Sequence, residues 1–127
     1  MTSVSPNAPL VLIVDDSEKN RKLARDVLRA GGLRTIEATD GRETLARAAE
    51  SLPDVILLDL RLPDMDGREV ARALRDSVRT RRIPVVALSA LRSGGDHDAL
   101  SADGFAGFLE KPIDVREFPG QVRSYCT

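Results

Sequence analysis

The sequence has little cysteine and little histidine, with one residue of each among its 127 residues. Cys126 has no partner for an internal disulfide, which fits a reducing compartment such as the cytoplasm. His97 has no second histidine and no nearby cysteine with which to share a metal ion, so no role is assigned to it.

Long hydrophobic runs and an excess of charge are also lacking. The apolar run near the start, Leu10–Val14, is far too short for a membrane span or a signal-peptide core. The 19 Lys and Arg and 20 Asp and Glu residues give a net charge of −1, which offers no bulk attraction to nucleic acid or to an anionic membrane. We therefore expect a soluble cytoplasmic protein with a short flexible tail over residues 1–9 and one domain over residues 10–127.

Five short apolar runs alternate with helical patterns along the chain. The expected strands are Leu10–Val14, Arg34–Ala38, Val55–Leu58, Ile83–Leu88 and Ala106–Glu110. The first helix is expected from about Ser17 to Ala30, where Gly31 and Gly32 end it. This alternation predicts an α/β fold, in which helices cover both faces of a doubly wound parallel sheet.

Similar acidic motifs open three of the helical patterns. Asp40-Gly-Arg-Glu43 and Asp66-Gly-Arg-Glu69 are the same four residues, and Asp114-Val-Arg-Glu117 has the same acid spacing. We interpret all three as capping boxes. Because Pro119 follows closely, Asp114–Glu117 is expected to form one turn before the last helix starts again.

Polar residues stand at the carboxyl ends of four expected strands, which is the edge where ligands bind in such sheets. Asp15 and Asp16 follow the first strand, and Asp59, Ser89 and Lys111 end or follow the third, fourth and fifth. Three carboxylates in one crevice repel one another strongly, so either some of them are protonated or a cation joins them. Hard oxygen ligands with room for water suit magnesium. The alternative is that these acids only cap the helices that follow. Neither G-x-G-x-x-G nor G-x-x-x-x-G-K-[ST] is present, so a glycine-lined nucleotide phosphate site is not expected.

This ordered set resembles the receiver domain of two-component response regulators, and the resemblance runs from about Leu10 to Tyr125. The residues that carry it are Asp15-Asp16, Asp59, Pro63-x-Met65-Asp66-Gly67, Ser89-Ala90 and Lys111-Pro112. The resemblance implies a five-stranded, flavodoxin-like sheet with strand order 2-1-3-4-5. It is closest to the stand-alone type, as in the chemotaxis response regulator.

The resemblance also implies a role for each matching residue. Asp59 is the expected phosphoacceptor, which takes a phosphoryl group from a histidine kinase or a histidine phosphotransfer protein. Magnesium is expected on Asp16, Asp59 and the backbone carbonyl of Arg61, with Asp15 acting through a water molecule. Lys111 is expected to pair with a phosphoryl oxygen, and Ser89 and Phe108 to form the switch that responds to it.

Two positions near this site vary within the family. Arg61 and Leu91 flank the path of the water that hydrolyses an aspartyl phosphate. We expect Arg61 to shield the phosphoryl group and Leu91 to offer no hydrogen bond to that water, which would give a long-lived phosphoryl group. The alternative is that both side chains point to solvent and have no effect. Asp64 is interpreted as a solvent-facing loop acid.

The expected function is a phosphorylation-switched signal rather than turnover of an external substrate. The chain is expected to assist its own phosphorylation and dephosphorylation. A fourth helix is expected at about Gly94–Ser101. The target is expected on the face made by this helix, the fifth strand and the fifth helix, since no residues remain for a DNA-binding module. The oligomeric state is left open between a monomer and a weak dimer.

Two rival functions are considered. One is a small magnesium-dependent phosphatase, which often carries D-x-D at its first strand rather than adjacent acids. The other is a receiver-shaped scaffold that needs no phosphorylation.

Overall fold

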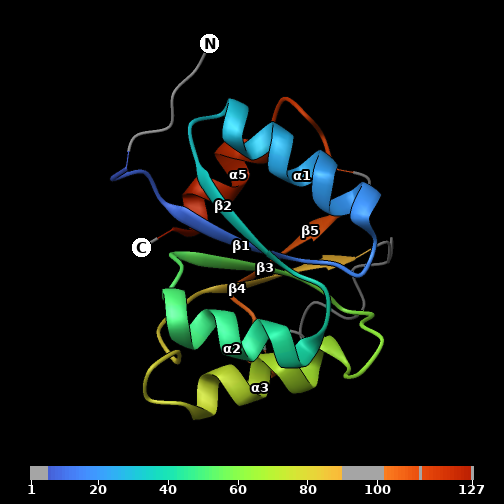
Figure 1. Cartoon of the computed structure of the whole chain (residues 1–127), viewed down its shortest axis with the longest axis vertical. Coiled ribbons are helices and arrows are strands. Elements are labelled where there is room, and N and C mark those ends of the chain that lie inside the picture. The colour runs from blue at the N-terminus through green and yellow to red at the C-terminus, as the bar shows by residue number, and fades with distance from the viewer. Residues whose placement is uncertain (1–5, 90–101, 112, 127) are drawn as a thin grey trace.

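The computed structural model describes residues 6–89, 102–111 and 113–126. Strands alternate with helices along the first of these segments, and one further strand and one further helix lie in the other two (Figure 1). The elements in chain order are β1 Leu10–Val14, α1 Glu18–Ala30, β2 Arg34–Ala38, α2 Gly41–Ser51, β3 Val55–Asp59, α3 Gly67–Asp76, β4 Val85–Ser89, β5 Gly107–Glu110 and α5 Phe118–Tyr125. The strands form one parallel sheet in the order β2-β1-β3-β4-β5. This confirms the predicted doubly wound fold and its strand order.

The sheet separates two hydrophobic cores, because successive side chains of a strand point to opposite faces. Leu12 and Val14 of β1 belong to the core beneath α2 and α3, whereas Val11 and Ile13 belong to the core beneath α1 and α5. Figure 1 shows the two pairs of helices on opposite sides of the sheet. All four side chains are at most 1% exposed, which explains why the strand reads as an unbroken apolar run.

Side-chain caps start the first three helices. Ser17 accepts a hydrogen bond from the amide of Asn20 at 3.3 Å and begins α1. At α2, Asp40 accepts from the amide of Glu43 at 2.7 Å, and the Glu43 carboxylate accepts from the amide of Thr39. In the predicted capping box, Glu43 would accept from the amide of the N-cap Asp40, but it accepts instead from the residue before it.

The Asp66 and Asp114 carboxylates each accept from the amide two residues on, which is one residue earlier than the capping-box pattern predicts. Asp66 begins α3 but accepts from the amide of Arg68 at 2.9 Å. Asp114 accepts from the amides of the two residues at 116 and 117, within a turn that precedes α5. α5 itself begins at Phe118 with Pro119 in its first turn, as the sequence predicted.

α5 packs closely against β5 at Gly107. A β-carbon at this position would overlap the hydroxyl oxygen and ring carbons of Tyr125, so glycine leaves room for the tyrosine ring. Phe118 and Val122 of the same helix are fully buried in the core beneath α1 and α5. The last helix is thereby fixed against the edge strand.

Four expected strand boundaries differ slightly from the structure. β3 extends through Asp59, β4 begins at Val85 rather than Ile83 and ends at Ser89 rather than Leu88, and β5 begins at Gly107 rather than Ala106. Of the expected tail, Ala8 and Pro9 accept hydrogen bonds from Arg34 through their carbonyls, at 2.8 and 2.9 Å.

Within the described residues, no helix has the length and apolarity needed to cross a membrane.

Candidate phosphoryl-transfer site

Three carboxylates meet at the carboxyl edge of the sheet. Asp15 and Asp16 directly follow β1, and Asp59 ends the neighbouring strand β3. One oxygen from each carboxylate lies within 4.8 Å of the other two. The adjacency of β1 and β3 therefore brings together residues that are far apart in the sequence.

Lys111 bridges two of these acids from the end of β5. Its Nζ atom lies 2.9 Å from Oδ2 of Asp15 and 3.0 Å from Oδ2 of Asp59. Burial of the ammonium lowers its pKa, but the hydrogen bonds and negative charges of Asp15 and Asp59 outweigh this effect and raise the pKa above its ordinary value of 10.5. Lys111 therefore remains charged at neutral pH and offsets part of the negative charge of the cluster.

Asp15 is 2% exposed, and a buried carboxylate is costly unless it is paired. Besides Lys111, its carboxylate accepts a hydrogen bond from the amide of Ser17 at 2.9 Å. Its own amide donates to the carbonyl of Ala38 at 3.2 Å, which ties it to the end of β2. Asp16, the next residue, is exposed at the mouth of the site.

Asp59 is held by the loop that follows it. Oδ1 of Asp59 accepts from the amide of Arg61 at 3.0 Å, while Oδ2 faces Lys111. The far end of this loop comes back to its beginning, where the amide of Gly67 donates to the carbonyl of Leu60 at 3.0 Å. A β-carbon on Gly67 would lie 2.8 Å from Cα of Leu60, so this close approach requires glycine.

The donor set suits a small hard cation. Asp15, Asp16 and Asp59 supply carboxylate oxygens close enough to share one ion, and the exposed Asp16 leaves the site open to water. Mg²⁺ is usually held in this way, by a few carboxylates together with several waters. The residues present therefore fit the predicted magnesium site.

The remaining predicted site residues are placed less completely. Arg61 is exposed, and Phe108 is half-buried against the core beneath α2 and α3. Ser89 ends β4 opposite Glu110, and its side chain is not among the described ones. Leu91 lies outside the described residues, as do His97, Pro112 and nearly all of the expected fourth helix.

One acid of the loop has a partner that the sequence did not predict. Asp64 is exposed, as expected, but its carboxylate accepts from the amides of Gly41 at 2.7 Å and Arg42 at 3.1 Å. It therefore caps the first turn of α2 from another loop. Above all, the hydrogen bond from Gly41 lowers the pKa of Asp64 below its ordinary value of 3.8.

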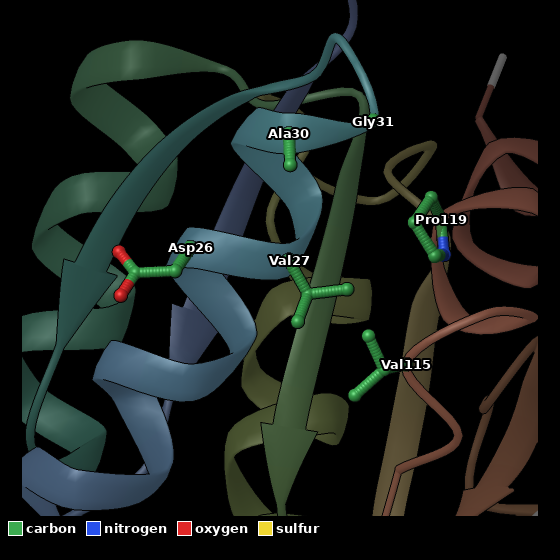
Figure 2. Close-up of a pocket in the computed structure, with 6 residues that line it drawn as sticks. All are labelled: Asp26, Val27, Ala30, Gly31, Val115 and Pro119. Carbon is green, nitrogen blue, oxygen red and sulfur yellow. The ribbon is translucent and has the colours of Figure 1, made fainter.

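A separate apolar pocket of about 390 Å³ lies between the C-terminal half of α1 and the start of α5 (Figure 2). It is lined by Asp26, Val27, Ala30, Gly31, Val115 and Pro119. Figure 2 shows Val27 and Val115 facing each other across it, while Asp26 points away. With one ionisable residue in its lining, this pocket lacks the combination of acids and a lysine that is found at the carboxyl edge of the sheet.

Comparison with known proteins agrees with this site. Residues 11–123 match the family model described as the response regulator receiver domain. The polar-differentiation response regulator DivK of Brucella anthropi is 41% identical over 115 residues, which cover 91% of this chain and 94% of that protein. The match therefore includes nearly the whole of both chains.

Solved structures give the same result. The chemotaxis response regulator CheY4 of Vibrio cholerae superimposes with a TM-score of 0.88 at 30% identity, over 94% of this chain and 99% of that one. The receiver domain of the sensor histidine kinase PA1611 from Pseudomonas aeruginosa PAO1 has a TM-score of 0.84 at 30% identity, over 93% of this chain and 97% of that one. The latter structure has a magnesium ion coordinated in its active-site cleft.

The fold and the acidic edge define a two-component receiver domain, whose signalling is switched by phosphorylation. The chain belongs to the response regulator receiver domain family. Receiver domains interact with histidine kinases and with downstream targets.

Proposed function

We propose that Asp59 accepts a phosphoryl group from the phosphohistidine of a histidine kinase or of a histidine phosphotransfer protein. A carboxylate oxygen of Asp59 forms the new bond to phosphorus, while the phosphorus–nitrogen bond breaks and its electron pair remains on the histidine. The observation that carries this proposal is the meeting of Asp15, Asp16 and Asp59 beside Lys111 at one sheet edge.

The residues around Asp59 would bind the metal ion and contact the phosphoryl group. Asp16, Asp59 and the carbonyl of Arg61 would hold Mg²⁺ directly, with Asp15 acting through a water molecule. The bound ion would screen the negative charges of the carboxylate and the phosphoryl group. Lys111 already contacts Asp59 at 3.0 Å, and we propose that its ammonium turns toward an incoming phosphoryl oxygen.

Intact-mass measurement after incubation with Mg²⁺ and a small acyl phosphate tests this assignment. We expect one added phosphate on the wild type and on Asp76→Asn, an exposed acid at the end of α3, but none on Asp59→Asn. No phosphate on the wild type would contradict the proposal and favour a scaffold that signals without phosphorylation.

We propose that the output of the protein is contact with another protein. Ser89 and Phe108 would transmit the change from Asp59 to a face that includes β5 and α5, together with the expected fourth helix outside the described residues. Under this proposal, the chain works in the cytoplasm, turns over no external substrate, and contributes only to its own phosphorylation and dephosphorylation.

The lifetime of the phosphoryl group depends, in this proposal, on Arg61 and Leu91. Arg61 is exposed next to Asp59 and carries a charge that can pair with phosphoryl oxygens. We expect Arg61→Asn and Leu91→Glu to lose phosphate faster than the wild type in a decay measured by mass or by radiolabel. Slower decay in either variant would show that its wild-type residue does not protect the phosphoryl group.

A further inference from the structure

Arg21 reaches the acidic site from α1 without being one of its acids. Its Nη1 atom donates to the backbone carbonyl of Asp15 at 2.8 Å, and its Nε atom donates to Glu37 at 3.2 Å. The Arg21 side chain is 14% exposed, so water competes little for these hydrogen bonds. One guanidinium therefore joins the end of β1 to the side chain of Glu37 on β2.

Glu37 is itself held in place by a second arginine. Arg25, one helical turn further along α1, donates from Nη1 to Glu37 at 3.0 Å. The two oxygens of Glu37 thus face two different guanidinium groups. This fixes the carboxylate against which Arg21 is oriented. Among the described residues, Arg25 contacts Glu37 and Asp26 but not the acids of the site.

The carbonyl of Asp15 controls the position of the next residue. This carbonyl and the amide of Asp16 belong to one planar peptide unit. A hydrogen bond that holds the carbonyl therefore also holds the orientation of the Asp16 amide. The other side of Asp16 is held by the bond from the amide of Ser17 to the carboxylate of Asp15. Arg21 therefore limits the backbone rotations that would swing the exposed Asp16 carboxylate away from Asp59.

We propose that Arg21 is a positioning residue for Mg²⁺ binding, and that it acts through the carbonyl of Asp15 rather than through its charge. This inference rests on the proposed magnesium site of Asp15, Asp16 and Asp59. Residues that orient metal ligands from outside the ligand set commonly change metal affinity by about 10- to 100-fold when removed.

The matched pair Arg21→Ala and Arg25→Ala tests this role. Each variant removes one guanidinium from α1 and one ion pair with Glu37, but only the first removes a bond to the Asp15 carbonyl. The dissociation constant for Mg²⁺ is measured on unphosphorylated protein by calorimetry, and checked by the rise of the melting temperature with Mg²⁺. We expect about a tenfold or greater loss of affinity in Arg21→Ala and little change in Arg25→Ala.

Phosphorylation kinetics give a second readout. With a small acyl phosphate, Arg21→Ala should need more Mg²⁺ for half-maximal rate yet approach the wild-type rate at saturating Mg²⁺. Arg21→Lys keeps one donor and should recover part of the lost affinity. If the alanine variant does not fold, Arg21→Gln, which keeps most of the packed stem, takes its place in the comparison.

Three results would overturn the inference. Unchanged Mg²⁺ affinity in Arg21→Ala would leave Arg21 with a structural role alone. Equal changes in Arg21→Ala and Arg25→Ala, or tighter binding in both, would assign the effect to charge instead of position. Wild-type protein that binds no Mg²⁺ would instead remove the proposed site, and this inference with it.

Discussion

Two acids at this edge, Asp59 at the end of β3 and Asp64 in the loop that follows it, differ in what surrounds their carboxylates. Asp59 faces an ammonium, because Lys111 lies 3.0 Å from its Oδ2 atom. Asp64 instead faces the free backbone amides at the start of α2. The first arrangement places negative charge beside a cationic group, and the second uses negative charge to stabilise the start of a helix.

The pH dependence of stability should reveal the Asp64 cap. The pKa of Asp64 is lowered in the folded state, mainly by the hydrogen bond from Gly41, so its contribution to stability is complete above the unfolded-state pKa of 3.8. That contribution is lost as the pH falls through the lower folded-state pKa. We expect urea unfolding to show Asp64→Asn less stable than the wild type at neutral pH, with the gap closing in acid. A gap that is independent of pH would contradict this role.

At the scale of single residues, the sequence predicts which residues belong to the site better than it predicts which residues they contact. Asp15, Asp16, Asp59 and Lys111 could be found because each follows an apolar run, and strand ends of a parallel sheet share one edge. The contacts of Asp64 and Arg21 were missed because they join residues of different elements. Asp64 reaches an amide 23 positions away, and no local pattern specifies that distance.

At the scale of elements, α2 ends in an unusual way. Leu52 caps its C-terminus in the left-handed region, with φ 48° and ψ 62°, and its amide donates to the carbonyl of Ala48. A β-carbon makes this conformation costly, whereas glycine adopts it freely. The Leu52 side chain is 46% exposed, so it contributes little packing in return.

Leu52→Gly should therefore stabilise the protein. We expect a gain of about 0.5–1 kcal/mol, after allowance for the greater freedom of glycine in the unfolded chain. The free energy of unfolding is measured with urea, with Leu52→Ala as the control that shortens the side chain but keeps the strain. A glycine variant no more stable than the alanine variant would show that the strain is not relieved.

Element boundaries were predicted well where the backbone pattern is uninterrupted. The bounds of β1 and β2 agree with the expectation, and α1 begins one residue after the expected Ser17, which is its cap. β4 starts later than expected because Ile83 and Pro84 belong to the apolar run but not to the strand. Proline has no amide to donate to a neighbouring strand, and the amide of Ile83 closes a turn on Thr80 instead.

At the scale of the whole molecule, the sheet is most protected at its centre. β1 and β3 are neighbours with strands on both sides, and Val11–Val14 and Val55–Leu58 are almost fully buried between the helix layers. Local opening that exposes these amides requires the loss of both cores. We expect native-state hydrogen exchange to be slowest in β1 and β3 and faster in the edge strands β2 and β5. Slowest exchange in an edge strand would contradict this order.

The overall fold could be predicted because it depends on repetition rather than on detail. Five apolar runs separated by helical patterns restrict the chain to a covered parallel sheet, and right-handed crossovers place its helices on both faces. The strand order came from the family resemblance, because apolar runs do not specify which strand lies beside which. The caps and ion pairs that hold the loops could not be predicted, since they depend on the final arrangement of the elements.

The packing of Tyr125 against Gly107 has a practical consequence. The sequence contains one tyrosine and no tryptophan, so ultraviolet fluorescence of the folded protein comes almost entirely from this single ring. The ring lies against the strand that carries Phe108 and leads into Lys111. Any rearrangement along β5 during signalling would therefore alter an optical signal that the protein already contains, and it could be followed in real time without a label.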